Sequence, residues 1–288
     1  MLTLKVRLIL ISTSSGDLTF RSQPLPATKV PYREECFGFI VHRGDLCEMS
    51  SALENDEIMI SDLEIMTSAS NYRAWMYRRL APFIGQRILE VGAGIGNFTE
   101  LLSGRELVVP TDKYQKCVNY LKRRLDDCPI AAVLQLDLEK PEDADLDRFS
   151  FDTVVCLNVL EHVKDDLRAL SFMRTVLEPG GRLVLLVPAF QFLYGSVDRA
   201  IGHHRRYTRR DLAPKMRQAG FEVEDSFYMN VIGMAGWFWN NRIMKIGEEN
   251  PAQIGLFDRY IAPWAERIER ALPPPFGLSL ITIGQWKN

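Results

Sequence analysis

The chain is 288 residues long and 47% apolar, enough to bury the core of one large domain or two small ones, and this excludes wholesale disorder. Its 35 Lys and Arg residues nearly balance 37 Asp and Glu residues, for a formal net charge of −2. Bulk electrostatic attraction to nucleic acid or to an anionic membrane is therefore not expected, although a local basic patch is compatible with this balance.

The cysteines and the apolar runs indicate where in the cell the protein is expected to lie. Five cysteines are scattered without a CxxC pair, which argues against a structural zinc site and a disulfide scaffold. The longest apolar stretch, Phe227–Trp239, is interrupted by Asn230 and is far shorter than the roughly 20 residues of a transmembrane helix. No convincing cleavage site follows the N-terminal run MLTLKVRLILIS. We expect a soluble, cytoplasmic protein without a transmembrane segment.

Residues 1–65 differ in texture from the rest of the chain. They combine prolines with Ser/Thr clusters and an acidic stretch, and no sustained periodicity emerges. The apolar runs Val6–Ile11 and Phe37–Val41 could form a hairpin or an edge strand. We nevertheless favour a poorly ordered or accessory N-terminal arm, followed by one domain over residues 66–288.

From residue 68 the pattern sharpens into alternating helices and strands. A first helix is indicated by apolar residues at helical spacing, with Ser70 or Asn71 as its cap: Tyr72, Trp75, Met76 and Leu80. The expected strands are 87–91, 106–110, 131–136, 153–157, 182–187, 221–227 and 278–283. Helices are expected from about residue 97 and over 115–126, 164–177 and 210–219. This alternation predicts a parallel sheet covered on both faces, with a ligand outside the carboxyl ends of its strands.

The strongest motif is RILEVGAGIGNF, residues 87–98. It reads as a buried strand followed by a turn in which Gly92, Gly94 and Gly96 allow a close approach of backbone to ligand. The spacing is GxGxG, whereas a dinucleotide fingerprint reads GxGxxG, so a dinucleotide-dependent oxidoreductase is disfavoured. Glu90 precedes the turn, where it can orient the loop or reach a ligand's amino group.

Polar residues follow the next strands in order. Asp112 ends the second strand and is suited to the two hydroxyls of a ribose, or to capping the following helix. Asp137 ends the third strand and is suited to the exocyclic amine of an adenine. FDTVVCLNVLEHV places Asn158 and His162 at the same edge, and LEPGGRLVLLVP supplies a turn before the fifth strand. Together these features favour a nucleoside-containing ligand.

The motifs ILEVGAGIG, VPTDKY, LQLDL, FDTVVCLNVLEHV and LEPGGRLVLLVP resemble those of the class I S-adenosylmethionine-dependent methyltransferases. The most similar subgroup acts on small molecules and includes ubiquinone-pathway methyltransferases. The resemblance spans roughly residues 72–228. It implies a Rossmann-like α/β fold with a seven-stranded, mostly parallel sheet and helices on both faces. The strands 221–227 and 278–283 would form an antiparallel edge, with a helical cap over about 229–275 inserted before the last strand.

The resemblance also implies which residues surround S-adenosyl-L-methionine. Asp112 would bind the ribose, Asp137 and Leu138 the adenine, and Asn158 the methionine side near the sulfonium. Lys113 or Tyr114 would flank the adenine. The complete set is Tyr72, Glu90, Gly92, Gly94, Gly96, Asp112, Lys113, Asp137, Leu138 and Asn158.

Two histidines, His162 and His203, are candidate catalytic bases. In the subgroup that the chain resembles, a histidine in the position of His162 lies close to the transferred methyl group. A neutral imidazole there could take a proton from a hydroxyl acceptor. The alternative is that His162 is satisfied by the backbone after the fourth strand. Cys156 reads as a packed strand residue rather than a nucleophile.

The stretch Tyr194–Arg217 is rich in cations and follows the fifth strand. One interpretation is a clamp for an anionic substrate group, because guanidinium groups match phosphate or carboxylate oxygens. The other is a solvated helix face that begins near Thr208. Trp237, in the aromatic segment, could line an apolar pocket or pack in a helical core. The residues expected to bind substrate are Tyr194, His204, Arg205, Arg206 and Trp237.

We therefore predict methyl transfer to oxygen or carbon of a small, apolar and anionic acceptor, lipid-like or phosphorylated, without a metal. RNA or protein methylation is opposed by the near-neutral charge and the lack of an NPPY-type tetrapeptide, so no nucleic-acid partner is expected. A non-catalytic S-adenosylmethionine-binding scaffold is opposed by the intact glycines and Asp112. The sequence leaves the acceptor, the attacked atom and the oligomeric state open.

Overall fold

The computed structural model describes residues 7–12, 18–23, 63–126, 130, 132–239 and 251–287. The chain divides into two compact units, residues 1–58 and 59–288. In the first unit, β1 (Arg7–Ser12) and β2 (Leu18–Gln23) pair as an antiparallel sheet. The run Phe37–Val41 and most of the expected arm lie outside the described residues, so the arm stays a prediction.

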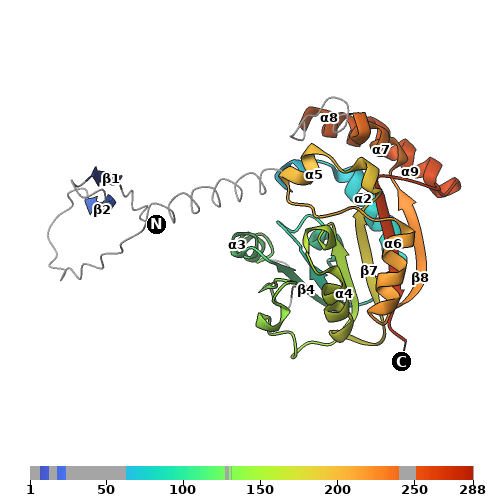
Figure 1. Ribbon diagram of the computed structural model, residues 1–288, viewed down its shortest axis with the longest axis horizontal. Helices are drawn as coiled ribbons and strands as arrows, with labels where there is room; N and C mark the ends of the chain where they lie inside the picture. The colour runs from blue at the N-terminus through green and yellow to red at the C-terminus, as the bar shows by residue number, and fades with distance from the viewer. Residues whose placement is uncertain are drawn as a thin grey trace. The chain divides into compact units, whose positions relative to one another are not determined.

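The second unit is built on a seven-stranded sheet in the order β5-β4-β3-β6-β7-β9-β8 (Figure 1). Its strands are β3 (Arg87–Val91), β4 (Leu107–Asp112), β5 (Leu134–Gln135), β6 (Phe151–Leu157), β7 (Leu177–Pro188), β8 (Glu222–Met229) and β9 (Ser279–Gln285). Strand β9 lies between β7 and β8 and is antiparallel to both, whereas the other neighbouring pairs are parallel. The predicted mostly parallel sheet with an antiparallel edge is confirmed.

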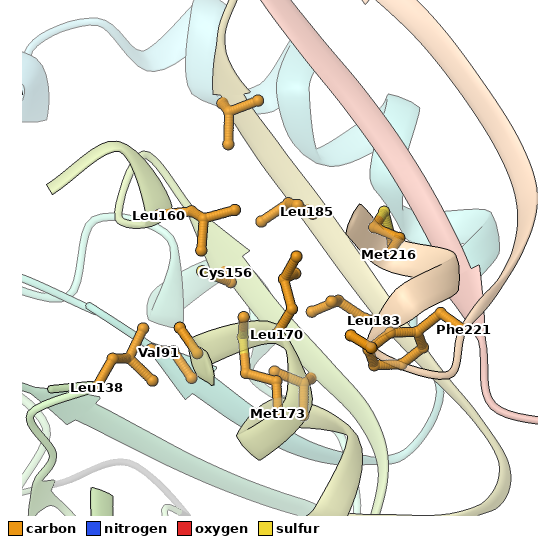
Figure 2. Packing of buried hydrophobic residues seen from close by; sticks show 14 of the residues in the cluster. Val91, Leu138, Cys156, Leu160, Leu170, Met173, Leu183, Leu185, Met216 and Phe221 are labelled. Carbon is orange, nitrogen blue, oxygen red and sulfur yellow. The ribbon is translucent and has the colours of Figure 1, made fainter. Parts of the chain in front are cut away.

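Helices pack on both faces of this sheet. Strand β7 shows why, because successive side chains of a strand point to opposite faces and here both faces are buried. Leu183 and Leu185 pack in one layer with α4 (Asp166–Thr175) and α6 (Arg209–Gln218), as Figure 2 shows. Val184 and Leu186 pack in the other layer, with α2 (Ser70–Leu80) and α9 (Ala262–Ala271). The remaining helices are α3 (Gln115–Arg124), α5 (Ser196–Ala200), α7 (Val231–Phe238) and α8 (Pro251–Leu256).

Two expected elements are wrong in type or length. The helix expected from about residue 97 is only a 3-10 turn, Thr99–Leu102. In this turn Leu101 N donates to Phe98 O at 2.9 Å rather than to Asn97 O, which accepts from the Arg73 side chain at 2.8 Å. The expected strand 131–136 is reduced to the two residues of β5, which pair with Thr111 and Asp112 at the end of β4.

The N-terminus of α2 is capped by a residue distant in sequence. Neither Ser70 nor Asn71 is the cap, because the N-cap is Ala69 and no side chain of this segment caps the helix. Instead the Asp258 carboxylate accepts from Tyr72 N at 2.8 Å and from Asn71 N at 3.2 Å. A carboxylate is favourable here, since it meets unpaired amides and the positive end of the helix dipole.

Asp258 attaches the helical insertion to α2, and Glu269 joins two helices within the insertion. Asp258 is buried and belongs to a π-helical turn, Phe257–Ile261, between α8 and α9. Glu269 of α9 is also buried, and its carboxylate accepts from Asn230 N at 3.0 Å and Val231 N at 2.8 Å at the start of α7. The helical cap predicted before the last strand is therefore present, and two buried carboxylates hold it.

Replacing Asp258 with alanine should lower the free energy of unfolding by about 1–3 kcal/mol, because amides at the start of α2 would lose their acceptor. Urea denaturation measures this change. The matched control is Asp147→Ala, at an exposed position, which should stay within about 0.5 kcal/mol of the parent protein. Equal losses in the two variants would contradict the capping role.

Candidate active site

The glycine-rich loop after β3 has the backbone that its sequence predicts. Gly92, Gly94 and Gly96 have φ angles of 72°, 57° and 90°, a region that other residues rarely adopt. A Cβ atom on Gly92 would lie 2.2 Å from Cγ2 of Val159. Glycine at this position therefore lets the loop after β3 approach the loop after β6 closely.

Residues before α2 cover the same loop. Residues 63–67 are helical, and a Cβ atom on Gly94 would lie 3.1 Å from the Leu63 side chain. Asn97 holds the two segments together, since it donates to Leu63 O at 2.8 Å and accepts from the Thr67 hydroxyl at 2.8 Å. The glycine loop is thus fixed from both sides, by the β6 end and by the helical segment before α2.

Asp112 joins the end of β4 to the glycine loop. Its carboxylate accepts from Gly94 N and from Tyr114 N, each at 2.9 Å. Burial raises the pKa of Asp112, while these hydrogen bonds oppose the rise. It does not cap α3, whose N-cap is Tyr114. Because each carboxylate oxygen can accept more than one hydrogen bond, both retain capacity for ribose hydroxyls.

Glu90 is hydrogen-bonded to Thr99, which follows the glycine-rich loop. The Glu90 side chain is buried, and it accepts a hydrogen bond of 2.6 Å from the Thr99 hydroxyl. Burial, together with the neighbouring Asp112, raises the pKa of Glu90 to about 7. Of the two roles that the sequence suggested, this contact fits the orientation of the loop.

The residues expected around the adenine differ in exposure. Lys113 and Asp137 form an ion pair of 3.4 Å, and Asp137 also accepts from Glu139 N at 2.9 Å. Leu138 is buried in the core beside Val91, as Figure 2 shows. Lys113 and Asp137 therefore have exposed polar atoms that a ligand could contact, whereas Leu138 does not.

The other two expected cofactor residues have distinct surroundings. Asn158 is exposed after β6, has a positive φ of 53° and donates its backbone N–H to Leu186 O at 2.8 Å. The Tyr72 ring packs edge-on against Trp75 and Phe257, with centroids 5.9 and 6.4 Å away. Asn158 thus lies at the expected sheet edge, whereas the Tyr72 ring contacts the helical insertion.

Two histidines from distant parts of the chain meet beside this edge. The rings of His162 and His203 are 4.6 Å apart between centroids and nearly perpendicular. His162 ends a 3-10 turn, Leu160–His162, and is exposed, whereas only 8% of the His203 side chain is exposed. Desolvation and the neighbouring His203 lower the pKa of His162 to about 4, so its imidazole is neutral at pH 7. Its ring is also hydrogen-bonded to the backbone of Gly202. Both interpretations of His162, a catalytic base and a histidine satisfied by the backbone, therefore stay open.

Asp198 orients His203. Its Oδ1 lies 2.8 Å from His203 Nδ1 and also accepts from Arg206 Nε at 2.8 Å. Burial alone would raise the pKa of Asp198, but the hydrogen bonds from His203 and Arg206 hold it at about 2. A carboxylate at this position places the imidazole proton on Nδ1 and leaves Nε2 of His203 as an acceptor.

Glu161 lies beside the two histidines. It was not identified as a site residue from the sequence, although it directly precedes His162. It is fully buried, and neither carboxyl oxygen has a hydrogen-bond partner among the described residues. Its Oε1 lies 3.7 Å from His203 Nε2, and burial raises the pKa of Glu161 to about 8. Ligand atoms of Glu161, His162 and His203 lie within 4.8 Å of one another, close enough to hold a divalent cation.

The residues expected to bind substrate are largely engaged within the protein. Arg206 is buried and paired with Asp198, while Arg205 forms an ion pair of 2.9 Å with Asp166. The Tyr194 hydroxyl donates to His203 O at 2.7 Å. His204, by contrast, is exposed. Substrate binding by these residues stays a prediction. Tyr194 contacts His203 directly, and Arg206 shares the Asp198 carboxylate with it.

The later cations of the basic stretch lie on α6, which begins near Thr208, as one interpretation of the sequence predicted. Thr208 caps α6, with Asp211 completing the capping box, and Arg209 and Arg210 are exposed. Trp237 links α7 to this region, since its Nε1 donates to Leu193 O at 3.4 Å and its ring stacks on Arg206 at 4.8 Å. Cys156 is fully buried and packs in the sheet, as predicted.

Comparison with known proteins agrees with this geometry. Residues 69–226, more than half of the chain, match the family model of a methyltransferase domain. The chain belongs to this family and is a class I S-adenosylmethionine-dependent methyltransferase. A ubiquinone biosynthesis O-methyltransferase of Xanthomonas euvesicatoria is 28% identical over 174 residues, which cover 55% of this chain and 70% of that protein.

Two further relatives are less informative about function. An uncharacterized 37.1 kDa transposon protein of Streptomyces fradiae is 28% identical over 189 residues, 60% of this chain. The match spans 54% of that protein, about half its length. A putative methyltransferase of Haloferax volcanii, solved with its Trm112 activator, has a TM-score of 0.55 at 18% identity. It covers 80% of this chain and 96% of its own and shows the shared fold.

The residues at the sheet edge fit S-adenosylmethionine. The loop at Gly92 has no room for a Cβ atom, so only glycine fits there, and the Asp112 carboxylate retains acceptor capacity at the end of β4. Asp137 stands at the next strand end, and Asn158 lies exposed after β6. We expect Asp112 to hold the ribose and the glycine loop to hold the methionine portion.

Asp112→Ala should weaken S-adenosylmethionine binding by at least about tenfold, because it removes the expected ribose acceptor and releases Gly94 N. Calorimetric titration measures the affinity, and urea denaturation of the same variant measures stability. Asp147→Ala, on an exposed loop, is the control and should bind as the parent does. Unchanged affinity in Asp112→Ala would refute the ribose assignment.

Proposed function

We propose that the protein methylates a hydroxyl oxygen of a small acceptor with an apolar body. The observation that carries this proposal is the exposed, neutral His162 imidazole backed by His203 and Asp198. A hydroxyl must lose its proton when it is methylated, so a nearby proton acceptor is what oxygen transfer requires. The similarity to a ubiquinone biosynthesis O-methyltransferase supports the same chemistry.

The position of His162 near the glycine-rich loop supports its proposed role as the base. Val159 approaches Gly92, and His162 follows three residues later on the same turn. Lys113, beside the expected adenine position, is near enough to lower the pKa of His162. S-adenosylmethionine, when bound, supplies an activated methyl group on a sulfonium. The chain must hold the acceptor oxygen in line with this group and receive its proton.

His162 would receive the proton directly. A hydroxyl becomes strongly acidic as its oxygen gains the methyl group, so a weakly basic, neutral imidazole is sufficient. His203 packs edge-on against His162 and would position it, while Asp198 and the Tyr194 hydroxyl fix His203. Asp198 remains ionised at neutral pH because its pKa is about 2. The ionised carboxylate also stabilises positive charge that develops on the histidine pair.

The acceptor's apolar body is suggested by side chains near this array. Phe192 is exposed beside Phe190 in the segment after β7, and Trp237 of α7 contacts Leu193. An anionic group on the acceptor is supported by the exposed His204 and Arg199 rather than by Arg206, whose charge is neutralised by Asp198. Screening phosphorylated, prenylated and phenolic compounds for uptake of labelled methyl tests this acceptor class.

With an acceptor from that screen, His162→Gln should lower kcat by about 100-fold or more while S-adenosylmethionine affinity stays unchanged. Gln keeps the side chain polar but cannot take up a proton. Product formation and calorimetric affinity, measured on the same preparation, separate the two effects. A parallel loss of cofactor affinity would show that His162 supports the loop instead.

Dialysis against a chelator decides between proton transfer and cation chemistry at the cluster of Glu161, His162 and His203. The proposal predicts unchanged product formation in chelated protein, since no step needs an ion. Activity that is lost on chelation and restored by a divalent cation would contradict it. An acceptor methylated only at carbon would contradict the hydroxyl assignment.

A further inference from the structure

The helical insertion presents its largest apolar side chains outward. Residues 251–271 form one continuous helical segment of α8, the π-helical turn and α9. Five apolar residues along and just past it recur at intervals of four and are 56–73% exposed, and we call them the apolar stripe. They are Leu256, Tyr260, Trp264, Ile268 and Leu272.

The stripe is not the side of the helix that faces the fold. The buried positions on that side are small residues and carboxylates, Ala262, Ala265, Asp258 and Glu269, and the half-buried Phe257 packs beside them against Tyr72. An ordinary surface helix buries its large apolar face and exposes its charges. Here the segment contacts the fold through Phe257, its alanines and two capping carboxylates, whereas the five residues of the apolar stripe stay largely exposed.

The charges of this segment are sorted by sign. All three acids are turned to the fold, since Asp258 and Glu269 cap helices and Glu266 pairs with Arg78. All three arginines, Arg259, Arg267 and Arg270, are exposed, and none forms an ion pair with a residue in the described ranges. The outer surface around the stripe is therefore cationic, although the whole chain is nearly neutral.

Two of these arginines stand directly beside aromatic members of the stripe. The Arg259 guanidinium lies 5.4 Å from the Tyr260 ring centroid, and that of Arg267 lies 5.2 Å from Trp264. Tyrosine and tryptophan combine an apolar ring with a polar edge, which suits a boundary between water and hydrocarbon. Arginine beside such rings suits contact with phosphate oxygens at the same depth.

Helix α7 extends the apolar character of this end of the domain. Ile232, Phe238 and Trp239 are all 40% or more exposed, and α7 contains no buried residue. Figure 1 shows α7, α8 and α9 gathered at one end of the second unit. No helix in the described ranges is long and apolar enough to cross a bilayer. An apolar helical surface of this kind can lie on a bilayer without crossing it.

We propose that this end of the domain docks onto the surface of an anionic lipid bilayer through the apolar stripe and its flanking arginines. Charge complementarity favours this partner over a second copy of the chain. A two-fold contact between stripes would place arginines against arginines, with the segment's acids turned away from the contact. The inference rests on the insertion alone and holds whatever the methyl acceptor is.

The test is co-sedimentation of the full chain with vesicles of phosphatidylcholine, either alone or containing about a quarter phosphatidylglycerol. The proposal predicts binding to the anionic vesicles, weak binding to the neutral ones and a loss of binding in high salt. The combined variant W264S/I268S/L272S should bind at least about tenfold more weakly, because it removes the apolar contact. These side chains are exposed, so folding should be preserved, and circular dichroism checks this.

A charge-reversed variant separates the contribution of the arginines. R267E/R270E should weaken binding by about fivefold or more for each arginine replaced, whereas K122E/R123E, the same charge change on α3, should have little effect. Equal losses in the two variants would overturn the proposal, because net charge alone would then explain binding.

Two further results would also overturn it. The first is a dimer by light scattering that becomes monomeric in W264S/I268S/L272S, which would assign the stripe to a second copy. The second is a monomer that fails to bind anionic vesicles, which would mean that the chain covers the stripe itself.

Discussion

The hydrogen bond from Gly94 N to the Asp112 carboxylate is the contact on which the site depends. It ties the loop after β3 to the end of β4 at a distance of 2.9 Å. The close approach of Gly92 to Val159 adds the end of β6. Because β4, β3 and β6 are adjacent and parallel, their carboxyl ends meet at one edge, and these contacts fix the loops there. The cofactor site and the histidine pair follow from this arrangement.

Buried carboxylates organise the rest of the molecule in a related way. Asp198 holds His203 and Arg206, Asp258 anchors the helical insertion to α2, and Glu269 joins α9 to the start of α7 within the insertion. Each is removed from water, and each is satisfied by hydrogen bonds from amides or cations. Turning these acids inward also has an external consequence, because the arginines of the insertion are left on its surface. The anchoring of the insertion and its proposed affinity for lipid thus share one cause.

The sequence was sufficient to predict the sheet and the backbone conformation of the glycine-rich loop. Buried strands beside GxGxG, and carboxylates at successive strand ends, are local patterns that parallel α/β folds require. It was insufficient where a role depends on residues distant in the chain. Asp258 caps α2 across 186 residues, and nothing near Tyr72 signals it. For the same reason the sequence did not indicate the ion pair between Arg206 and Asp198, which forms only in the folded loop.

Calorimetric titration of the full chain with S-adenosylmethionine, S-adenosylhomocysteine and NAD tests the central claim most directly. The account predicts that the first two bind with affinities in about the micromolar range and that NAD does not bind. Protein that is folded by circular dichroism but binds neither S-adenosyl compound would contradict it. The glycine loop and Asp112 would then have kept their geometry without the ligand for which that geometry is suited.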